Sequence, residues 1–255
     1  MRLRKYRDLL LIFVWREFTV RYRQSSIGIL WALVQPLSMM LLFLFIFSYV
    51  LKVQNSSYPQ MLFFYAGLLP WLFFSSALNY SIPSLTTQYQ LITKIYFPRE
   101  ILPISGIAVA FIDYLIALAL FVVFLVIYQI KVSWLALWMI PLTAMLVLFT
   151  ASVSIFLAGL NVYYRDVKLA TAFLLQLWFF ASPVMYSIDK LDMKIKVLLF
   201  LNPLTFIIEN MRRCVLEDRD IVYWQFFLVG GIVALSYKLA YRYFIKIERA
   251  FADVI

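Results

Sequence analysis

The sequence predicts an all-α membrane protein with six transmembrane helices, an N-terminal amphipathic interface helix and a re-entrant segment in the last external loop. Composition supports this class, because 65% of the 255 residues are hydrophobic and only 14% are charged. A soluble domain has about 45–50% apolar and about 25% charged residues. Six apolar stretches supply the spans, each about 20 residues or more, the length that crosses a hydrocarbon core of ~30 Å as a helix.

These stretches predict helices and not barrel strands, because they are continuously apolar and lack the alternation of a strand between lipid and water. The length predicts one membrane domain over residues 1–255, with no room for a separate soluble domain. Residues 27–187 hold spans one to five, 221–244 the sixth, and 245–255 a cytoplasmic tail. The predicted spans are Ile27–Leu51, Met61–Leu85, Ile101–Gln129, Trp134–Leu160, Val167–Ser187 and Ile221–Phe244.

Residues 1–26 predict a helix in the cytoplasmic headgroup layer. Their apolar run Leu9–Trp15 is short and lacks the cleavage site of a signal peptide. An apolar stripe with helical spacing favours an interface helix, which would either only anchor the chain or also frame a lateral entry for a lipid-like molecule. The stripe consists of Leu11, Val14, Trp15, Phe18 and Tyr22, and the interface helix is assigned Trp15, Arg16, Arg21, Tyr22 and Arg23.

The loop 188–220 contains a second irregular feature. Its apolar stretch Ile195–Ile208 has only 14 residues and is interrupted by Asn202-Pro203. Such a stretch is too short to span, so we expect it to enter the outer leaflet and return. The alternative is a seventh crossing, which would leave the basic C-terminus outside.

The distribution of basic residues predicts the topology, because Lys and Arg favour the cytoplasmic side of short loops. Of 23 such residues, 15 lie near the two termini and in the loops after the second and fourth spans. The six in the loop 188–220 are matched by six acidic residues. We therefore expect a multi-pass protein of the cytoplasmic (inner) membrane with both termini in the cytoplasm. The net charge of +10 is assigned to contact with anionic headgroups rather than nucleic acid.

Several kinds of chemistry are excluded by residue type. The chain has no histidine, and Cys214 is its one cysteine, which excludes His/Cys metal sites and an intrachain disulfide. None of the six glycines begins a phosphate-binding loop followed by Lys-Ser/Thr, so we expect no ATPase site in this chain. We expect no catalytic residue, metal or cofactor of its own.

Asp113 is the one clear acidic residue within the predicted spans. An unpaired carboxylate in the membrane costs several kcal/mol, so it is a functional candidate by default. It could couple ion flow to transport, or it could be a hydrogen-bonded carboxyl near a helix end or interface. The second interpretation is favoured, because no other titratable residue joins it at depth.

Aromatic residues make up 19% of the chain. Some are expected in interfacial belts and others in helix packing. Aromatic faces also stack on sugar rings without a fixed hydrogen-bond pattern, and rings crowd the second and fifth predicted spans. A passage for sugars could therefore use them as its wall.

Four groups of motifs then resemble a known family. Residues 15–37 contain WRE, RYRQS and QPL, and residues 91–103 read LITKIYFPREILP. Residues 161–167 read NVYYRDV, while 182–186 and 202–205 read SPVMY and NPLT. In combination, and over nearly the whole chain, they resemble the membrane subunit of type-2 ABC exporters for polysaccharides, which serve O-antigen, capsule and teichoic acid export.

The resemblance implies a homodimer with a separate ATP-hydrolysing subunit under each copy, and ATP and Mg²⁺ bound by that partner. A lipid-linked polysaccharide, O-antigen first among the candidates, would pass between the two copies. The segment Gln88–Arg99 matches the family's coupling helix, and Ile92, Ile95 and Phe97 exposed there would require a partner. The coupling residues are Gln90, Leu91, Ile92, Lys94, Ile95, Tyr96, Phe97 and Arg99. A cytoplasmic structural motif comprises Asn161, Arg165 and Asp166, and the possible channel aromatics are Trp31, Tyr65, Trp71, Trp178 and Tyr186.

Two other functions stay open on the residues alone. A secondary transporter would use Asp113 for ion coupling, but no internal repeat is visible in the sequence. A membrane-embedded transferase acting on lipid-linked sugars would need paired carboxylates or an Asp-rich loop, and neither face offers one. Co-purification with an ATPase subunit would separate the three functions.

Overall fold

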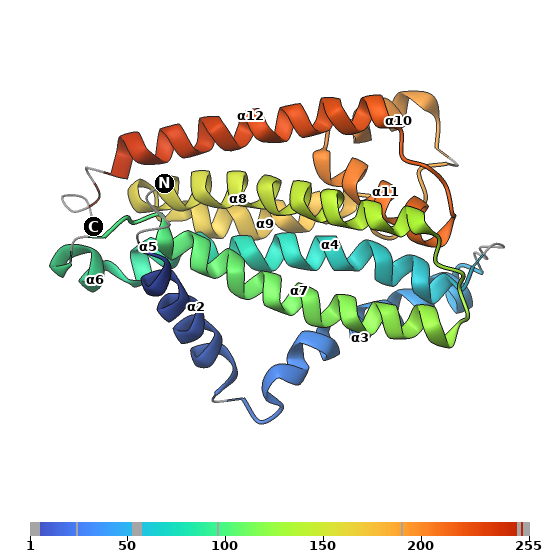
Figure 1. Ribbon diagram of the computed structural model, residues 1–255, viewed down its shortest axis with the longest axis horizontal. Helices are drawn as coiled ribbons and strands as arrows, with labels where there is room; N and C mark the ends of the chain where they lie inside the picture. Colours follow the sequence, from blue (N-terminus) through green and yellow to red (C-terminus); the bar gives the residue numbers. More distant parts are fainter. Residues whose placement is uncertain are drawn as a thin grey trace.

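A computed structural model describes residues 6–23, 25–52, 58–95, 97–189, 191–248 and 251. All regular structure within these ranges is helical, which confirms the all-α class. The long helices run side by side in an elongated bundle (Figure 1). We call the end with α5 and α6 the α6 end, and the opposite end, with α10, the α10 end.

The helices follow one another with short connections. The N-terminal half contains α2 (Arg7–Tyr22), the 3₁₀ turn η1 (Gly28–Leu30), α3 (Trp31–Leu44), the π-helical η2 (Phe45–Val50), α4 (Gln60–Ser81), α5 (Ser84–Thr87), α6 (Tyr89–Lys94) and α7 (Ile101–Ile127). The C-terminal half contains η3 (Trp134–Trp138), α8 (Met139–Tyr163), α9 (Asp166–Phe180), α10 (Met193–Phe200), α11 (Pro203–Leu216) and α12 (Tyr223–Glu248).

The helix α4 forms the centre of the bundle. It packs against α3, α7, α8 and α11, and most of its side chains are buried. A helix that is apolar on every side is stable when neighbours surround it, which explains the continuous hydrophobicity of this segment. Consequently the residues of α4 face other helices of the same chain.

The helix α2 leaves the bundle at an angle and α3 returns to it, so that the two form a V beside the other helices (Figure 1). Along α2, Phe13 and Tyr22 are buried, whereas Trp15 is 72% exposed. The predicted apolar stripe is therefore divided between the bundle and the outside, because Tyr22 faces α7 and Trp15 does not.

The segment 188–220 forms two helices. Its apolar stretch breaks at Asn202, whose side chain accepts a 3.1 Å hydrogen bond from the backbone N–H of Leu204 and so caps α11. Pro203 occupies the first position of α11, where its missing N–H costs nothing. α11 then lies inside the bundle at the α10 end, against α4 and α8.

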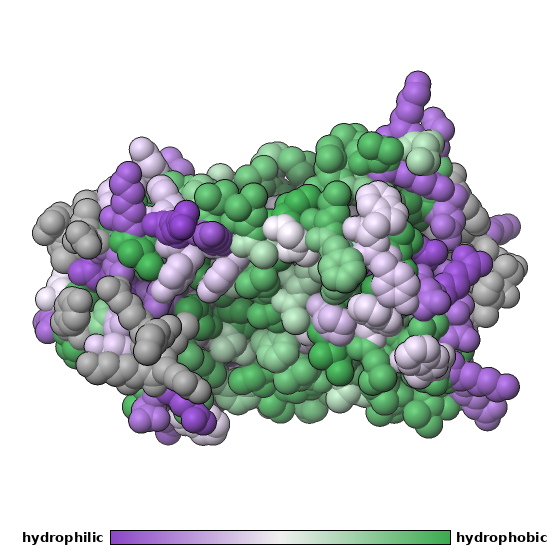
Figure 2. Space-filling model, turned by 45° about the horizontal axis from the view of Figure 1, so that its top comes forward, coloured by the Kyte–Doolittle hydropathy of each residue, from purple (hydrophilic) through white to green (hydrophobic). Residues whose placement is uncertain are grey.

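Four described segments are long and apolar enough to cross a membrane, namely 28–50, 60–87, 101–127 and 134–163. α9 has 15 residues and is too short by itself, whereas α12 has 26 and meets the length but is less apolar. The face in Figure 2 has a hydrophobic middle and hydrophilic residues at both ends, as expected of a membrane protein. The predicted fifth span, Val167–Ser187, thus ends as a helix seven residues early, at Phe180.

Candidate functional site

The predicted coupling segment projects from the bundle as α6 at the α6 end (Figure 1). Ile95 is 58% exposed, and Gln90 and Lys94 are also exposed. Ile92 and Phe97 are buried, however, so the expectation that all three apolar residues are exposed is wrong. Tyr96 lies outside the described residues.

The cause is α2, the predicted interface helix, which packs over the segment. Phe13 of α2 stacks on Phe97 with 5.8 Å between the ring centroids. Ile92 belongs to the same small core, which lies at the α6 end between α2, α5, α7, α8 and α12. Of the three apolar residues named above, Ile92 and Phe97 are therefore covered by the chain itself, whereas Ile95 is exposed.

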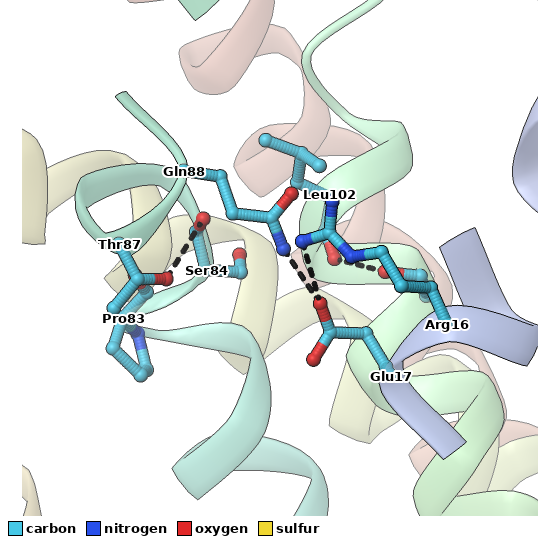
Figure 3. Close-up of polar contacts among 8 residues, drawn as sticks. Arg16, Glu17, Pro83, Ser84, Thr87, Gln88 and Leu102 are labelled. Carbon is cyan, nitrogen blue, oxygen red and sulfur yellow. Dashed lines mark hydrogen bonds and ion pairs between the residues drawn. The ribbon is translucent and has the colours of Figure 1, made fainter. Parts of the chain in front are cut away.

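A polar contact joins α2 to the start of α6. The Gln88 side chain donates a 2.6 Å hydrogen bond to the Glu17 carboxylate, and Arg16 donates to the same oxygen at 3.3 Å (Figure 3). A cavity of about 230 Å³ lies beside this contact, between α2, α5 and the adjoining ends of α4 and α7. The interface helix and the coupling segment are thus in direct contact.

The other end of the segment is held by α12. The backbone N–H of Arg99 donates a 2.9 Å hydrogen bond to the Glu248 carboxylate, and the Arg99 guanidinium donates to the Glu248 backbone carbonyl. The coupling segment is therefore fixed by α2 at one end and α12 at the other. A force applied to α6 would reach both helices.

Asp113 is paired with the interface helix. The Arg21 guanidinium forms an ion pair with its carboxylate, and the Tyr22 hydroxyl donates a 2.5 Å hydrogen bond to it. Burial, together with this hydrogen bond, raises the pKa of the Tyr22 hydroxyl, so that it stays protonated and donates. Asp113 is thus the hydrogen-bonded carboxyl at an interface, and it ties α2 to α7; Arg23 beside this contact is exposed.

The predicted cytoplasmic structural motif, at the junction of α8 and α9, has one buried and two exposed members. Asn161 is 3% exposed and donates to the backbone carbonyl of Ile82 at 3.2 Å and to the Thr86 hydroxyl at 3.3 Å. It therefore ties α8 to α5. Arg165 and Asp166 are exposed at the start of α9.

The five aromatic candidates have different positions. Tyr65 is fully buried and donates a 3.0 Å hydrogen bond to the Ala117 carbonyl, and Trp71 is 5% exposed. Because α4 is surrounded by other helices, these two rings pack the core and do not lie at a surface that a passage could use. Trp31 is 47% exposed, whereas Trp178 and Tyr186 are half-buried.

Exposed rings lie on the outward faces of α9 and of α3 with η2, and others lie on α12, where Trp224 and Phe227 are 65% and 72% exposed. On α9, Phe173 and Phe180 are 61% and 64% exposed, and on η2 Tyr49 is 74% exposed. Both surfaces also carry an exposed polar side chain in an apolar run, Gln176 on α9 and Gln35 on α3. An amide side chain is more stable in contact with water or protein than with acyl chains. These faces are therefore expected to contact something other than lipid alone.

Sequence reasoning missed Arg212, which it counted as a loop charge. Its side chain is almost completely buried in α11 and stacks on Phe63 of α4, 3.8 Å from the ring centroid. It donates to backbone carbonyls of Phe63, Pro183, Val184 and Tyr186, with 2.6 Å to Pro183. The sequence did contain a signal for this burial. Ile208 lies four residues before Arg212 and Val215 three residues after it, so on a helix the three side chains share an apolar face.

Comparison with known proteins agrees with this architecture. Residues 8–216 match the family model described as ABC-2 type transporter. The chain is similar to the O-antigen export system permease protein RfbA of Klebsiella pneumoniae, with 31% identity over 92% of this chain and 93% of that protein. The protein of the same name from Myxococcus xanthus is 31% identical over 84% of this chain and 83% of its own length.

A more distant similarity is to the polysialic acid transport protein KpsM of Escherichia coli, with 24% identity over 79% of this chain and 78% of that protein. The motif-based resemblance to polysaccharide export permeases is thereby confirmed. The chain belongs to the ABC-2 type transporter family of multi-pass membrane proteins.

Proposed function

We propose that this chain is the membrane-spanning subunit of an ATP-driven exporter that moves a lipid-linked polysaccharide, O-antigen first among the candidates, across the cytoplasmic membrane. The observation that carries the proposal is the 31% identity to O-antigen export permeases over nearly the full length of both chains. The bundle of apolar helices with a projecting α6 and an attached interface helix supports it.

The proposed topology has six crossings, with both termini and the α6 end in the cytoplasm. The fifth crossing is made by α9 and the turn that follows it, and the sixth by α12. α10 and α11 form the re-entrant segment, entering from the α10 end and returning to it. The burial of α11 between α4 and α8 supports this, because only backbone that is covered by protein is tolerated at that depth.

The proposed assembly is a homodimer that encloses the passage between the outward faces of α3 and α9. Exposed rings and the amides of Gln35 and Gln176 on these faces support it, since both suit weak contacts with sugars. The second predicted span does not contribute, because Tyr65 and Trp71 are in the core. The wall is therefore revised to Trp31, Tyr49, Phe173 and Phe180 with the two glutamines.

Energy comes from a separate ATP-hydrolysing subunit that docks on α6 and binds ATP and Mg²⁺. The links from the coupling segment to α2 and α12 support a mechanism in which movement of α6 is passed to the interface helix and the last helix. Ion coupling by Asp113 is disfavoured, because its carboxylate is already paired with Arg21 and Tyr22.

The test is reconstitution in proteoliposomes, with the chain alone and with its ATPase subunit. The complex should hydrolyse ATP and move lipid-linked O-antigen into a protease- and glycosidase-protected compartment, whereas the lone chain should do neither. Transport by the lone chain driven by an ion gradient, or ATP turnover by the lone contaminant-free chain, contradicts the proposal.

A further inference from the structure

A polar cavity of about 540 Å³ opens at the α6 end, separate from the one beside Glu17 and Gln88. Small-molecule sites commonly have volumes of roughly 300–1,000 Å³. One wall comes from α5 and α6, and the other from the junction of α8 and α9. Its lining residues are Thr86, Tyr89, Asn161, Val162, Tyr163, Arg165 and Lys168.

The charge of this cavity is positive. Arg165 and Lys168 contribute two cations, and the lining includes no carboxylate. Within the described part of the chain, the ion pairs are formed by Arg16, Arg21 and Arg219, so neither cation of the cavity is neutralised by a carboxylate. The positive end of the α9 dipole is already offset by the Asp166 carboxylate in its first turn, so the positive charge of the cavity comes from the Arg165 and Lys168 side chains. An anion is the ligand that these groups favour.

A second observation comes from Asn161, whose side chain is buried in the same wall. Its amide nitrogen is used by Ile82 and Thr86, but its oxygen Oδ1 has no hydrogen-bond partner among the described residues. A buried acceptor without a donor is costly. Because Oδ1 is itself covered in this structure, a ligand hydroxyl would donate to it only after the Asn161 amide turns toward the cavity; a phosphorylated sugar supplies such hydroxyls as well as negative charge.

The surface beyond the cavity is apolar. Leu169 follows Arg165 by four residues, so it lies on the same face of α9, and it is 71% exposed. A ligand with an anionic head in the cavity and an apolar tail would cover this face. An acidic side chain of a protein partner could fill the cavity but would leave this apolar face of α9 exposed.

We propose that the cavity binds the phosphate-bearing headgroup of the lipid that carries the glycan, with Arg165 and Lys168 on the phosphate oxygens and Asn161 near the first sugar. This rests on the proposed function and names the part of the substrate that the cytoplasmic end recognises. It gives Arg165 a ligand-binding role in place of the structural one predicted from the sequence.

The experiment measures binding to the chain assembled with its ATPase subunit in lipid nanodiscs. The probes are a polyisoprenyl diphosphate carrying one sugar and inorganic pyrophosphate, and the variants are Arg165→Gln with Lys168→Gln and the charge-conserving Arg165→Lys with Lys168→Arg. The matched control is Arg242→Gln, an exposed cation of α12 outside the cavity.

The lipid probe should bind at least tenfold more weakly to the glutamine double variant, and near wild-type strength to the charge-conserving variant and to Arg242→Gln. Pyrophosphate should bind much more weakly than the lipid to the wild type. Unchanged lipid binding by the glutamine double variant overturns the proposal, as does equal binding of pyrophosphate and lipid, which identifies a site for free phosphate.

Two further outcomes separate the possible failures. Loss of the ATPase subunit from the glutamine double variant, with lipid binding unchanged, identifies a docking surface for that subunit and overturns the proposal. If the wild type binds the lipid through these residues but exports no polysaccharide, the proposed function is wrong, whereas the proposed lipid-binding site is supported.

Discussion

Arg21 and Arg212 lie in different parts of the bundle, and each is held in a different way. Arg21 pairs with the carboxylate of Asp113, and its side chain keeps 23% of its exposure. Arg212 is almost completely buried, and its hydrogen bonds go to four backbone carbonyls. Arg21 attaches α2 to α7. Arg212 instead donates hydrogen bonds to carbonyl groups of the non-helical turn after α9.

The need for such donors follows from the length of α9. Its 15 residues extend about 22 Å at 1.5 Å per residue, less than the ~30 Å of a hydrocarbon core. The chain then continues through the turn of residues 181–186. Carbonyl groups at that depth require donors, because lipid offers none. Arg212 would therefore allow the proposed fifth crossing to end in a turn instead of a longer helix.

Gly67 belongs to the same arrangement. A Cβ atom at this position would lie 2.0 Å from Nη2 of Arg212 and 2.7 Å from the Val184 carbonyl oxygen. Any side chain on α4 here would displace the guanidinium from the turn. The α10 end thus depends on side chains and backbone of three segments fitting together, whereas Arg21 of α2 contacts the side chains of two other helices, Asp113 of α7 and Tyr80 of α4.

Replacement of Arg212 by Met should give the largest loss of stability. The carbonyls of Pro183 and Val184 would lose their donor, at about 1–3 kcal/mol for each buried group. We expect a marked fall in the thermal unfolding midpoint in detergent, measured by intrinsic fluorescence. Arg213→Met is the control, because this neighbour is only partly buried; an equal fall for both variants would mean that the backbone contacts have no special weight.

Gly67→Ala should give a smaller loss than Arg212→Met, because the long Arg212 side chain can shift away from the added methyl group. Some loss should remain, since the Val184 carbonyl belongs to the backbone and cannot move as easily. Overpacking of this kind costs about 1–3 kcal/mol. Gly231→Ala is the matched control, since its Cβ would meet nothing within 4 Å. The control should be neutral or slightly stabilising, because Ala favours a helix over Gly. If the Gly67→Ala protein is as stable as the Gly231→Ala protein, the close packing of Gly67 against Arg212 and Val184 is not important for stability.

Asp113→Asn should have a local effect. It removes the charge opposite Arg21 and leaves the bundle intact, so the expected cost is about 1–2 kcal/mol for the weakened hydrogen bonds. Backbone amides of α2 should exchange with deuterium faster, while those of α4 stay protected. ATP-driven export should persist in this variant, and its complete loss with α2 still protected would restore an ion-coupling role for Asp113.

The sequence could predict where the helices are but not which way their rings face. Tyr65 and Phe173 both lie in apolar spans, and one is buried while the other is exposed. Lipid and protein core are both apolar, so hydrophobicity carries no signal that distinguishes them. The pairing of Arg21 with Asp113 joins residues 92 positions apart, and no local pattern reports such a contact.

Ile95→Asp should change stability least, because the side chain is already exposed on the projecting coupling segment. Surface substitutions usually stay within about 0.5 kcal/mol. Its effect should appear in assembly instead, because a charge at the docking surface would be buried without a partner when the ATPase subunit binds. We expect normal thermal unfolding of the chain together with at least tenfold weaker co-purification of that subunit.

Phe97→Asp provides the contrast within the same segment. Phe97 is buried against Phe13, so a carboxylate there disturbs the core at the α6 end and should lower the unfolding midpoint. Loss of assembly in this variant alone would therefore report misfolding and not docking. If Ile95→Asp still assembles and exports normally, α6 is not the docking surface, and the contacts of Gln88 and Arg99 with α2 and α12 only stabilise the fold.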